Sequence, residues 1–123
     1  KKKNKNFILL HCVSSYPLLE ENVNLPKLEY IKKFTDKIGY SGHTKGIEDA
    51  IAAMSMGAKV VEKHFTINNK LPGRDNLNAI LPNEMTKLRN FKNSLEKMTI
   101  NKGFDLQKCE LDIFKNYRGR WSK

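Results

Sequence analysis

The sequence predicts an α/β fold, in which the short buried strands of a parallel sheet alternate with helices that connect them. Three short apolar runs, at residues 7–13, 37–41 and 58–66, are bounded by loop residues and have the length of buried strands. Segments with helical periodicity lie between these runs, and a longer one follows the last of them. This alternation, with short links, is typical of an open doubly wound sheet or of part of a (β/α)₈ barrel.

The first two strands and the helix between them follow from short patterns. FILLHCV at residues 7–13 is closed by SSYP, as expected for a buried strand that ends in a loop. A helix of about ten residues is expected from Leu25, with Pro26 in its first turn. KIGYS at residues 37–41 predicts the second strand. The apolar face of the helix comprises Leu25, Leu28, Ile31 and Phe34.

A second helix and a third strand come next. GIEDAIAAMSMG at residues 46–57 predicts a helix that Gly57 terminates, since glycine readily adopts the conformation needed just after a helix. AKVVEKHFT at residues 58–66 predicts the third strand. The face of the helix that we expect to be buried comprises Ile47, Ala50, Ile51 and Met54.

The longest helix follows a loop at residues 67–82. Asn83 offers an N-cap for it, because the asparagine side chain can accept a hydrogen bond from a free N–H of the first turn. Residues 99–123 form a tail of weak helical periodicity, with an aromatic and basic end at Tyr117 and Trp121, to which the sequence assigns no structure. The apolar stripe of the helix comprises Met85, Leu88, Phe91, Leu95 and Met98.

Charge and cysteine content restrict the classes of protein to which the chain could belong. At 123 residues it is long enough for one domain with a buried core. Its net charge of +10 would suit a nucleic acid, but the lysines are scattered and no nucleic-acid-binding motif accompanies them, so we expect no such partner. Cys12 and Cys109 lie far apart without a CxxC pair, which predicts two reduced thiols.

The N-terminal segment has a basic start but lacks the apolar run of a signal peptide. The chain does not begin with Met, and its opening KKKNK leads directly into a predicted strand, so we expect a fragment of a longer protein. The apolar run after KKKNK is too short for a signal peptide. No stretch approaches the roughly 20 apolar residues of a membrane span. We therefore expect a cytoplasmic protein without membrane contact.

Two histidines end the second and third strands. Because side chains alternate along a strand, Ser41 shares a face with His43, and Glu62 shares a face with His64. Strands joined by a single right-handed crossover are commonly neighbours, so the two imidazoles can reach one metal ion. The carboxyl ends of the strands are also where α/β proteins bind their ligands.

A structural role stays open for each histidine, because a lone histidine at a strand end is commonly held by hydrogen bonds. Two imidazoles are also too few ligands for a metal, so carboxylates, substrate or water must complete the coordination. Ser14 and Tyr16 follow the first strand on the functional face, whereas His11 falls on the opposite face and is interpreted as structural. Lys63 likewise has the outward orientation of its strand, which favours a structural role.

Four motifs carry a resemblance to a known family. LLHCVSSYP, IGYSGHT, GAKVVEKHFT and LPGRD have the order and spacing found in the NeuB-type sialic acid synthases, and the similarity covers about residues 7–98. That family condenses phosphoenolpyruvate with an N-acylated hexosamine, of the N-acetylmannosamine type, to make a nonulosonic acid for surface carbohydrates. Its fold is a (β/α)₈ TIM barrel. The resemblance implies that residues 1–123 are the C-terminal half of such a domain, with its sixth, seventh and eighth strands and their helices.

The resemblance also implies roles for individual residues. His43 and His64 match the metal ligands, for Mn²⁺ or Mg²⁺, and together with Tyr16 and Asp75 they are the implied catalytic residues. Phosphoenolpyruvate and an amino sugar are the implied substrates. The residues expected to bind these substrates are Ser14 and Ser41 near the phosphate, Tyr16 and Asp75 at the sugar, and Arg74 beside Asp75.

Three positions depart from the family pattern. The family commonly reads SDHT and PGPD, whereas this chain reads SGHT and PGRD. Gly42 therefore lacks a carboxylate that could orient the neighbouring site, and Arg74 adds a cation next to Asp75. Ser14 stands where the family often has Asn. These departures indicate a divergent member and leave the acceptor sugar open.

The implied chemistry is a metal-assisted condensation. The metal polarises the aldehyde oxygen of the open-chain sugar, C3 of phosphoenolpyruvate attacks the carbonyl carbon, water adds at C2, and phosphate leaves by C–O cleavage. Two other classes stay open, namely a metal-dependent barrel aldolase and a non-catalytic module for sugar-phosphate binding or assembly. No lysine lies on the functional face of these strand ends to form a Schiff base, which counts against an aldolase.

Assembly is the last expectation from the sequence. A half-barrel exposes two strand edges and an apolar interior. We therefore expect the fragment to be inactive alone and to form a homo-oligomer, in the simplest case a dimer. The residues expected to lack packing partners are Ile8, Leu10, Ile38 and Val60.

Overall fold

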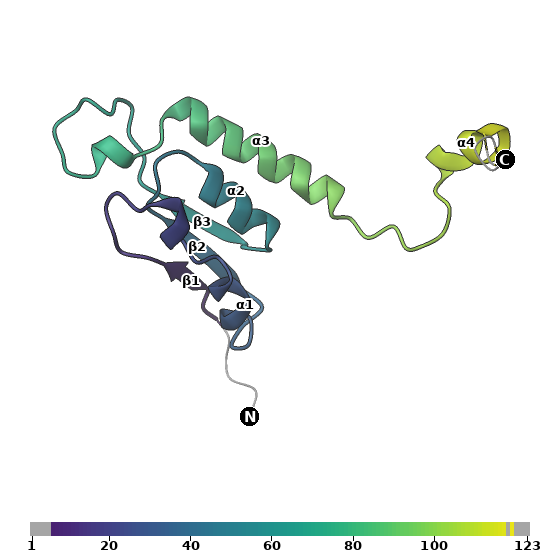
Figure 1. The fold of residues 1–123 in the computed structure, drawn as a ribbon, viewed down its shortest axis with the longest axis horizontal. Helices are drawn as coiled ribbons and strands as arrows, with labels where there is room; N and C mark the ends of the chain where they lie inside the picture. Colours follow the sequence, from purple (N-terminus) through teal and green to yellow (C-terminus); the bar gives the residue numbers. More distant parts are fainter. Residues whose placement is uncertain (1–5, 118, 120–123) are drawn as a thin grey trace.

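A computed structural model of the chain describes residues 6–117 and residue 119, and its strands and helices follow one another in the predicted order (Figure 1). Three short 3₁₀ helices accompany them within these residues: η1 (Glu20–Asn22), η2 (Asn76–Asn78) and η3 (Lys108–Glu110). The strands and α-helices are β1 (Leu9–Cys12), α1 (Lys27–Ile31), β2 (Ile38–Gly42), α2 (Glu48–Ser55), β3 (Val60–Lys63), α3 (Pro82–Met98) and α4 (Leu111–Tyr117).

Within the described residues, the strands form one parallel sheet in the order β1, β2, β3. This confirms the predicted α/β class with a parallel sheet, in which the second strand lies between the other two. In the register, Cys12 is opposite Ser41, and Ser41 is opposite Glu62. The carboxyl ends of the three strands therefore meet at one edge of the sheet, where β2 continues into His43 and β3 into His64.

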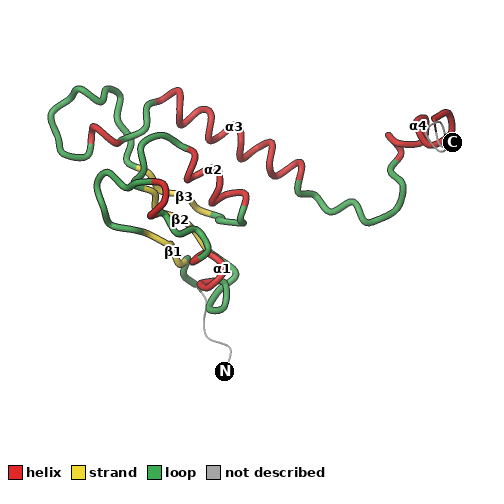
Figure 2. Tube along the Cα trace, viewed as in Figure 1, coloured by secondary structure: helices red, strands yellow, loops and turns green. Residues whose placement is uncertain are grey.

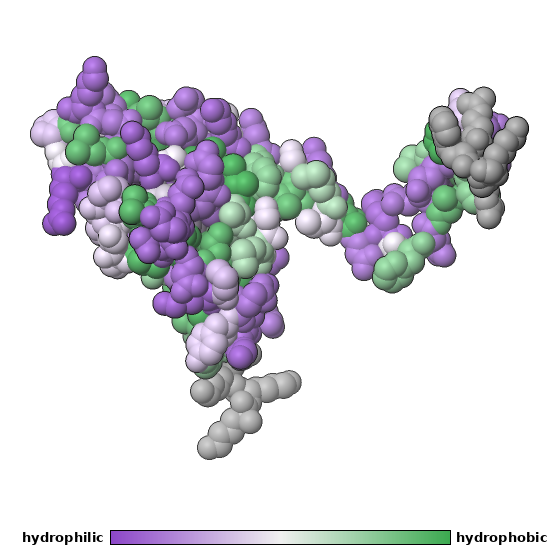
Figure 3. Space-filling model, in the orientation of Figure 1, coloured by the Kyte–Doolittle hydropathy of each residue, from purple (hydrophilic) through white to green (hydrophobic). Residues whose placement is uncertain are grey.

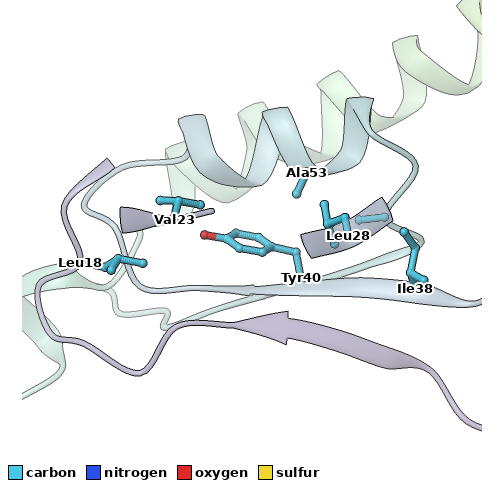
Figure 4. Close-up of a cluster of buried hydrophobic side chains, with 7 residues drawn as sticks. Leu18, Val23, Leu28, Ile38, Tyr40 and Ala53 are labelled. Carbon is cyan, nitrogen blue, oxygen red and sulfur yellow. The ribbon is translucent and has the colours of Figure 1, made fainter. Parts of the chain in front are cut away.

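The main core lies between β2 and the helices that connect the strands. Tyr40 and Ile38 point to the same face of β2, and both are almost fully buried. Figure 4 shows the Tyr40 ring between the sheet and α2, with Ala53 of α2 and Leu28 of α1 next to it. Both helices thus cover one face of the sheet. Burial of this apolar surface is the main contribution to the stability of the unit.

The opposite face of the sheet is only partly covered. Ile8 is 41% exposed, Val60 is 38% exposed and Leu10 is half-buried, in agreement with the expectation that these residues lack packing partners. The same expectation was wrong for Ile38, which is 1% exposed. Its place in the strand alternation turns it towards α1 and α2, together with Tyr40.

Several predicted boundaries were too wide. Helix α1 has five residues rather than about ten, Pro26 precedes it as the N-cap residue, and Phe34 beyond it is 51% exposed. Helix α2 ends as predicted, because Gly57 follows it with a φ of 95°. The predicted N-cap of α3 was wrong: the helix begins at Pro82, and Glu84 accepts a hydrogen bond from the backbone N–H of Leu81 at 2.8 Å.

Helix α3 packs on α2 through only part of its apolar stripe. Leu88 is buried beside Ile47 and Ala50 of α2, whereas Met98 is 69% exposed. Beyond Met98 the chain leads away from the body towards η3 and α4 (Figure 2), and every described residue of this tail is exposed. Figure 3 shows hydrophobic surface where the tail leaves the body and in patches along the tail. Trp121 lies outside the described residues.

Two further findings concern the whole described chain. Cys12 and Cys109 are both free and exposed, which confirms the predicted thiols. Among the described residues, no helix has the length and apolar character needed to cross a membrane.

Candidate functional site

His43 and His64 come together at the edge of the sheet where the parallel strands end. Their ring centroids lie 5.5 Å apart, at an interplanar angle of 35°. Each histidine directly follows the strand that carries it, and its backbone carbonyl is fixed by a different segment. The His43 carbonyl accepts a hydrogen bond from Leu18 at 3.2 Å, and the His64 carbonyl accepts one from Ile80 at 2.8 Å. The single crossover through α2 thus brings the pair together in space.

The hydrogen bonds of His43 orient its ring. Its Nδ1 lies 2.9 Å from the carbonyl oxygen of Val13, which can only accept, so Nδ1 carries the proton and donates. In the neutral ring, Nε2 then has a free electron pair, towards which the Tyr16 hydroxyl donates at 3.0 Å. Nε2 is therefore the His43 atom available to a cation or to a substrate.

Tyr16 closes the site from the segment that follows β1. Its ring centroid lies 4.3 Å from that of His43 and 5.7 Å from that of His64. The side chain is 40% exposed, so it contacts both imidazoles on one side and solvent on the other. Tyr16 is placed to contact any molecule that approaches the two histidines.

These side chains line a cavity of about 210 Å³. Four residues predicted for the site take part in it, and the remaining three do not: Ser14 is exposed, and so are Arg74 and Asp75, which directly precede η2. The Ser14 hydroxyl instead lies 3.7 Å from the Cys12 sulfur. The lining comprises Tyr16, Ser41, Gly42, His43, Glu62, Lys63 and His64.

Glu62 is a cavity residue that we did not predict as part of the site. Its Oε1 accepts a hydrogen bond from the Ser41 hydroxyl at 2.7 Å. The alternation along β3, which puts Glu62 on the face of His64, was the available signal. A hydroxyl has one proton, so Ser41 cannot donate to a phosphate oxygen while it donates to Glu62.

His11 lies on the opposite face of the sheet, as its strand position predicted. It is 5% exposed, and its Nε2 donates to the carbonyl oxygen of Val23 at 2.7 Å. This bond ties the loop after β1 to the strand. The histidine therefore has the structural role that we expected of it.

A buried polar network lies behind the cavity, on the face covered by α2. Lys63 forms an ion pair with Asp49, and the Tyr40 hydroxyl donates to Asp49 at 2.9 Å. Burial, followed by the negative charge of Asp49, raises the pKa of the Tyr40 phenol far above its ordinary value. Tyr40 thus stays protonated and acts as a hydrogen-bond donor. The outward orientation that we predicted for Lys63 is confirmed.

The donor set restricts how a metal ion could be held. In the described part of the chain, no group of three or more His, Cys, Asp or Glu side chains is arranged to bind a metal. His43 and His64 therefore supply two nitrogen ligands at most, and oxygens of a substrate or of water must supply the others. Two imidazoles fit a transition-metal ion better than Mg²⁺, which prefers oxygen ligands.

A family model and two curated relatives match most of this chain. The sequence model described as NeuB family matches residues 1–103. Human N-acetylneuraminate-9-phosphate synthase is 40% identical to this chain over 110 residues, which are 88% of this chain and 31% of that protein. The N,N'-diacetyllegionaminic acid synthase of Legionella pneumophila is 45% identical over 82 residues, which are 66% of this chain and 23% of that protein. The chain thus spans a third or less of these relatives.

A solved structure shares the arrangement of the elements. It is the crystal structure of N-acetylneuraminic acid synthetase from Leptospira borgpetersenii serovar Hardjo-bovis in complex with citrate. The sequence identity is 36% and the TM-score is 0.77, over 95% of this chain and 41% of that one. The order of strands and helices described above is therefore similar to that of part of a sialic acid synthase.

Proposed function

This chain belongs to the NeuB family, and from that premise we propose that the protein containing it is a nonulosonic acid synthase. It condenses phosphoenolpyruvate with an N-acylated hexosamine, releases phosphate and serves carbohydrate biosynthesis in the cytoplasm. Relatives named as N-acetylneuraminate-9-phosphate synthase and N,N'-diacetyllegionaminic acid synthase support this class of reaction. The observation that carries the proposal is the cavity in which His43, His64 and Tyr16 meet at the carboxyl ends of parallel strands.

We place the chain in a (β/α)₈ barrel, as its sixth to eighth strand and helix units. The parallel order β1, β2, β3 and the likeness to the Leptospira structure support this placement. In such a barrel the partly exposed face with Ile8 and Val60 becomes the interior. The cavity with the two histidines then opens at the face of the barrel that carries the active site in enzymes of this fold.

The proposed cofactor is a divalent cation, Mn²⁺ rather than Mg²⁺, held by Nε2 of His43 and a ring nitrogen of His64. When bound, it acts as a Lewis acid towards the aldehyde oxygen of the open-chain sugar. The hydrogen bond from Nδ1 to Val13 fixes the His43 ring with Nε2 towards the cavity. The Tyr16 hydroxyl, 3.0 Å from that nitrogen, gives up this contact and donates to a substrate oxygen instead.

Glu62 and Ser41 act on the other side of the same cavity. Water that adds at C2 of phosphoenolpyruvate must lose a proton, and the Glu62 carboxylate is placed to accept it. Once Glu62 is protonated, its hydrogen bond from Ser41 is weaker. The Ser41 hydroxyl can then donate to the departing phosphate instead. Arg74 and Asp75 on the loop before η2, and Ser14 after β1, remain our predicted substrate contacts.

The test is the replacement of either histidine in the complete protein. Removing one of two protein ligands should abolish stoichiometric metal binding, so the turnover of His43→Ala and of His64→Ala should fall by several kcal/mol of transition-state stabilisation, on the order of a thousandfold or more. Phosphate release from phosphoenolpyruvate and bound metal should be measured on the same samples. Excess Mn²⁺ should restore activity only in part.

His11→Gln is the matched control. It changes the third histidine, which lies on the opposite face, and should keep turnover and bound metal even if the fold is less stable. Full activity with stoichiometric metal in either alanine variant would return that histidine to a structural role. Borohydride trapping of a substrate on the protein would favour the aldolase class instead.

A further inference from the structure

The ladder between β2 and β3 ends just before the two histidines. Its last pair is Gly42 and Lys63, so His43 and His64 both lie one residue beyond it. Their carbonyls are tied to Leu18 and Ile80, which belong to different segments. The last ladder pair and these two carbonyl contacts therefore hold the backbone on both sides of the site, and a side-chain contact adds to this frame.

The Lys63 ammonium supplies a link between the two strand ends. It donates to the Thr44 carbonyl at 2.9 Å and lies 3.3 Å from the Thr44 hydroxyl. Thr44 directly follows His43, and Lys63 directly precedes His64. A single buried cation therefore connects the backbone beside one imidazole to the backbone beside the other.

Asp49 of α2 holds that ammonium in place. Its two oxygens lie 2.8 and 3.1 Å from Lys63 Nζ, and both side chains are 2% exposed. Asp49 also accepts the hydrogen bond of Tyr40, which comes from β2. The network thus joins β2, α2 and β3, and its burial keeps water from competing for the contacts.

Gly42 leaves the space that this network occupies. A Cβ atom at position 42 would lie 2.7 Å from Cε1 of Tyr40 and closer still to the Asp49 carboxylate. The Asp49 carboxylate of α2 thus occupies the space towards which a side chain at position 42 would point.

We infer that the buried Lys63–Asp49 pair positions His43 and His64 for one shared metal ion, and that Gly42 is required to accommodate it. The inference rests on the proposed function, since it concerns the ion proposed there. The Lys63 ammonium contacts Thr44 and Asp49, and the Asp49 carboxylate contacts Lys63 and Tyr40, so both act through other residues and are positioning residues. Outer partners of metal ligands commonly contribute about 10- to 100-fold to metal affinity, and we expect an effect of this size.

The decisive variant replaces the whole network by apolar side chains of similar size: Tyr40→Phe, Asp49→Leu and Lys63→Met together. Replacing a buried ion pair in this way is often neutral or stabilising, so the metal-free variant should unfold at a denaturant concentration close to that of the parent. Its dissociation constant for Mn²⁺, measured in the complete protein from the electron paramagnetic resonance signal of the free ion, should rise about 10- to 100-fold.

The control is Lys59→Met, the same change at an exposed position just before β3, and it should bind Mn²⁺ like the parent. A folded triple variant with parental Mn²⁺ affinity would overturn the inference. A parent protein that binds no Mn²⁺ would instead overturn the metal part of the proposed function, and this inference with it.

A second comparison does not depend on the triple variant. Gly42→Asp alone forces two carboxylates together behind the histidines, so its Mn²⁺ affinity should fall strongly. Adding Asp49→Ala removes the closer of the two clashes, the one with the Asp49 carboxylate, and lets the carboxylate introduced at position 42 pair with Lys63, so affinity should recover by about tenfold or more. If the double variant binds Mn²⁺ no better than Gly42→Asp, the proposed coupling of these positions is wrong.

Discussion

At the scale of single residues, the site is organised by hydrogen bonds that the sequence does not show. Strand alternation was enough to predict that Ser41, His43 and His64 face one side, because the period of a strand is fixed. It could not predict that Ser41 donates to Glu62, because that contact depends on side-chain rotamers and on the register between β2 and β3. The bond from His43 to Val13 likewise depends on the loop after β1.

Removing the Tyr16 hydroxyl should lower catalytic turnover without weakening metal binding. In Tyr16→Phe the ring still packs on both imidazoles, while Nε2 of His43 loses its present hydrogen-bond donor. Mn²⁺ affinity should therefore stay the same or rise, whereas turnover should fall about a hundredfold if the hydroxyl donates to the reacting oxygen. Steady-state kinetics and metal titration of the same variant check this. Equal loss of both would show that Tyr16 mainly supports the fold of the site, and the exposed Tyr30→Phe is the control.

Tyr40 makes the stability of the unit sensitive to alkaline pH. In the unfolded chain its phenol loses the proton at about pH 10, whereas in the folded chain burial and Asp49 hold the pKa higher. The contribution of protonated Tyr40 is therefore complete below about pH 10 and is lost as the pH rises above this value. In Tyr40→Phe the free energy of unfolding should fall less steeply between about pH 9 and pH 11 than in the parent.

Denaturant unfolding at several pH values measures this difference. Tyr30→Phe, at a residue that is 57% exposed, should follow the parent over the same range. An equally steep fall in Tyr40→Phe would mean that other groups account for the alkaline loss.

At the scale of elements, the order of strands and helices could be predicted and their ends could not. Apolar periodicity predicts that an element exists, but its ends depend on caps and on tertiary contacts. Helix α1 shows this, because its apolar pattern continues to Phe34 while the helix ends at Ile31, and Phe34 is 51% exposed with its ring centroid 5.5 Å from that of Tyr30. Gly57 was the exception. A glycine after an apolar helical pattern is a recognisable helix end in the sequence, because glycine readily adopts the positive φ that this position requires.

Gly57 therefore offers a clean test of the end of α2. In Gly57→Ala the free energy of unfolding should fall by about 1 kcal/mol, because alanine is strained at a φ of 95°. Packing is not the cause, since an added Cβ would meet nothing nearer than Lys32 Nζ at 3.8 Å. Gly57→Asn should lose less, because asparagine tolerates this region better. Urea unfolding of both variants measures these free energies. Equal losses for Gly57→Ala and Gly57→Asn would indicate that a lost contact, rather than backbone strain, is the cause.

At the scale of the whole molecule, one face of the sheet and the tail are left with apolar residues in solvent. The covered face was predictable from the alternation of strands and helices. The course of residues 99–123 was not, because their weak periodicity gives no packing partner, and in the described part of the tail no residue is buried. The exposed residues of the body and tail include Ile8, Val60, Met98, Ile100 and Phe104.

The chain of 123 residues should self-associate when it is prepared alone. Strands β1 and β3 are edges of the sheet, and the face with Ile8 and Val60 is open, so both hydrogen bonding and apolar burial favour contact between copies. Light scattering over a range of concentrations should show an increasing mass. The double change Ile8→Lys and Val60→Lys should reduce it. A monomer at every concentration would contradict the expectation.

The succession of β2, α2 and β3 also has a consequence for the order of folding. Both proposed metal ligands directly follow strands of this one unit. The chain segment between them, which must close for the two imidazoles to meet, is therefore short, and its entropic cost is small. Contacts of low sequence separation form early during folding. We therefore expect the two imidazoles to approach one another as soon as this unit forms, before segments that are more distant in the sequence have folded.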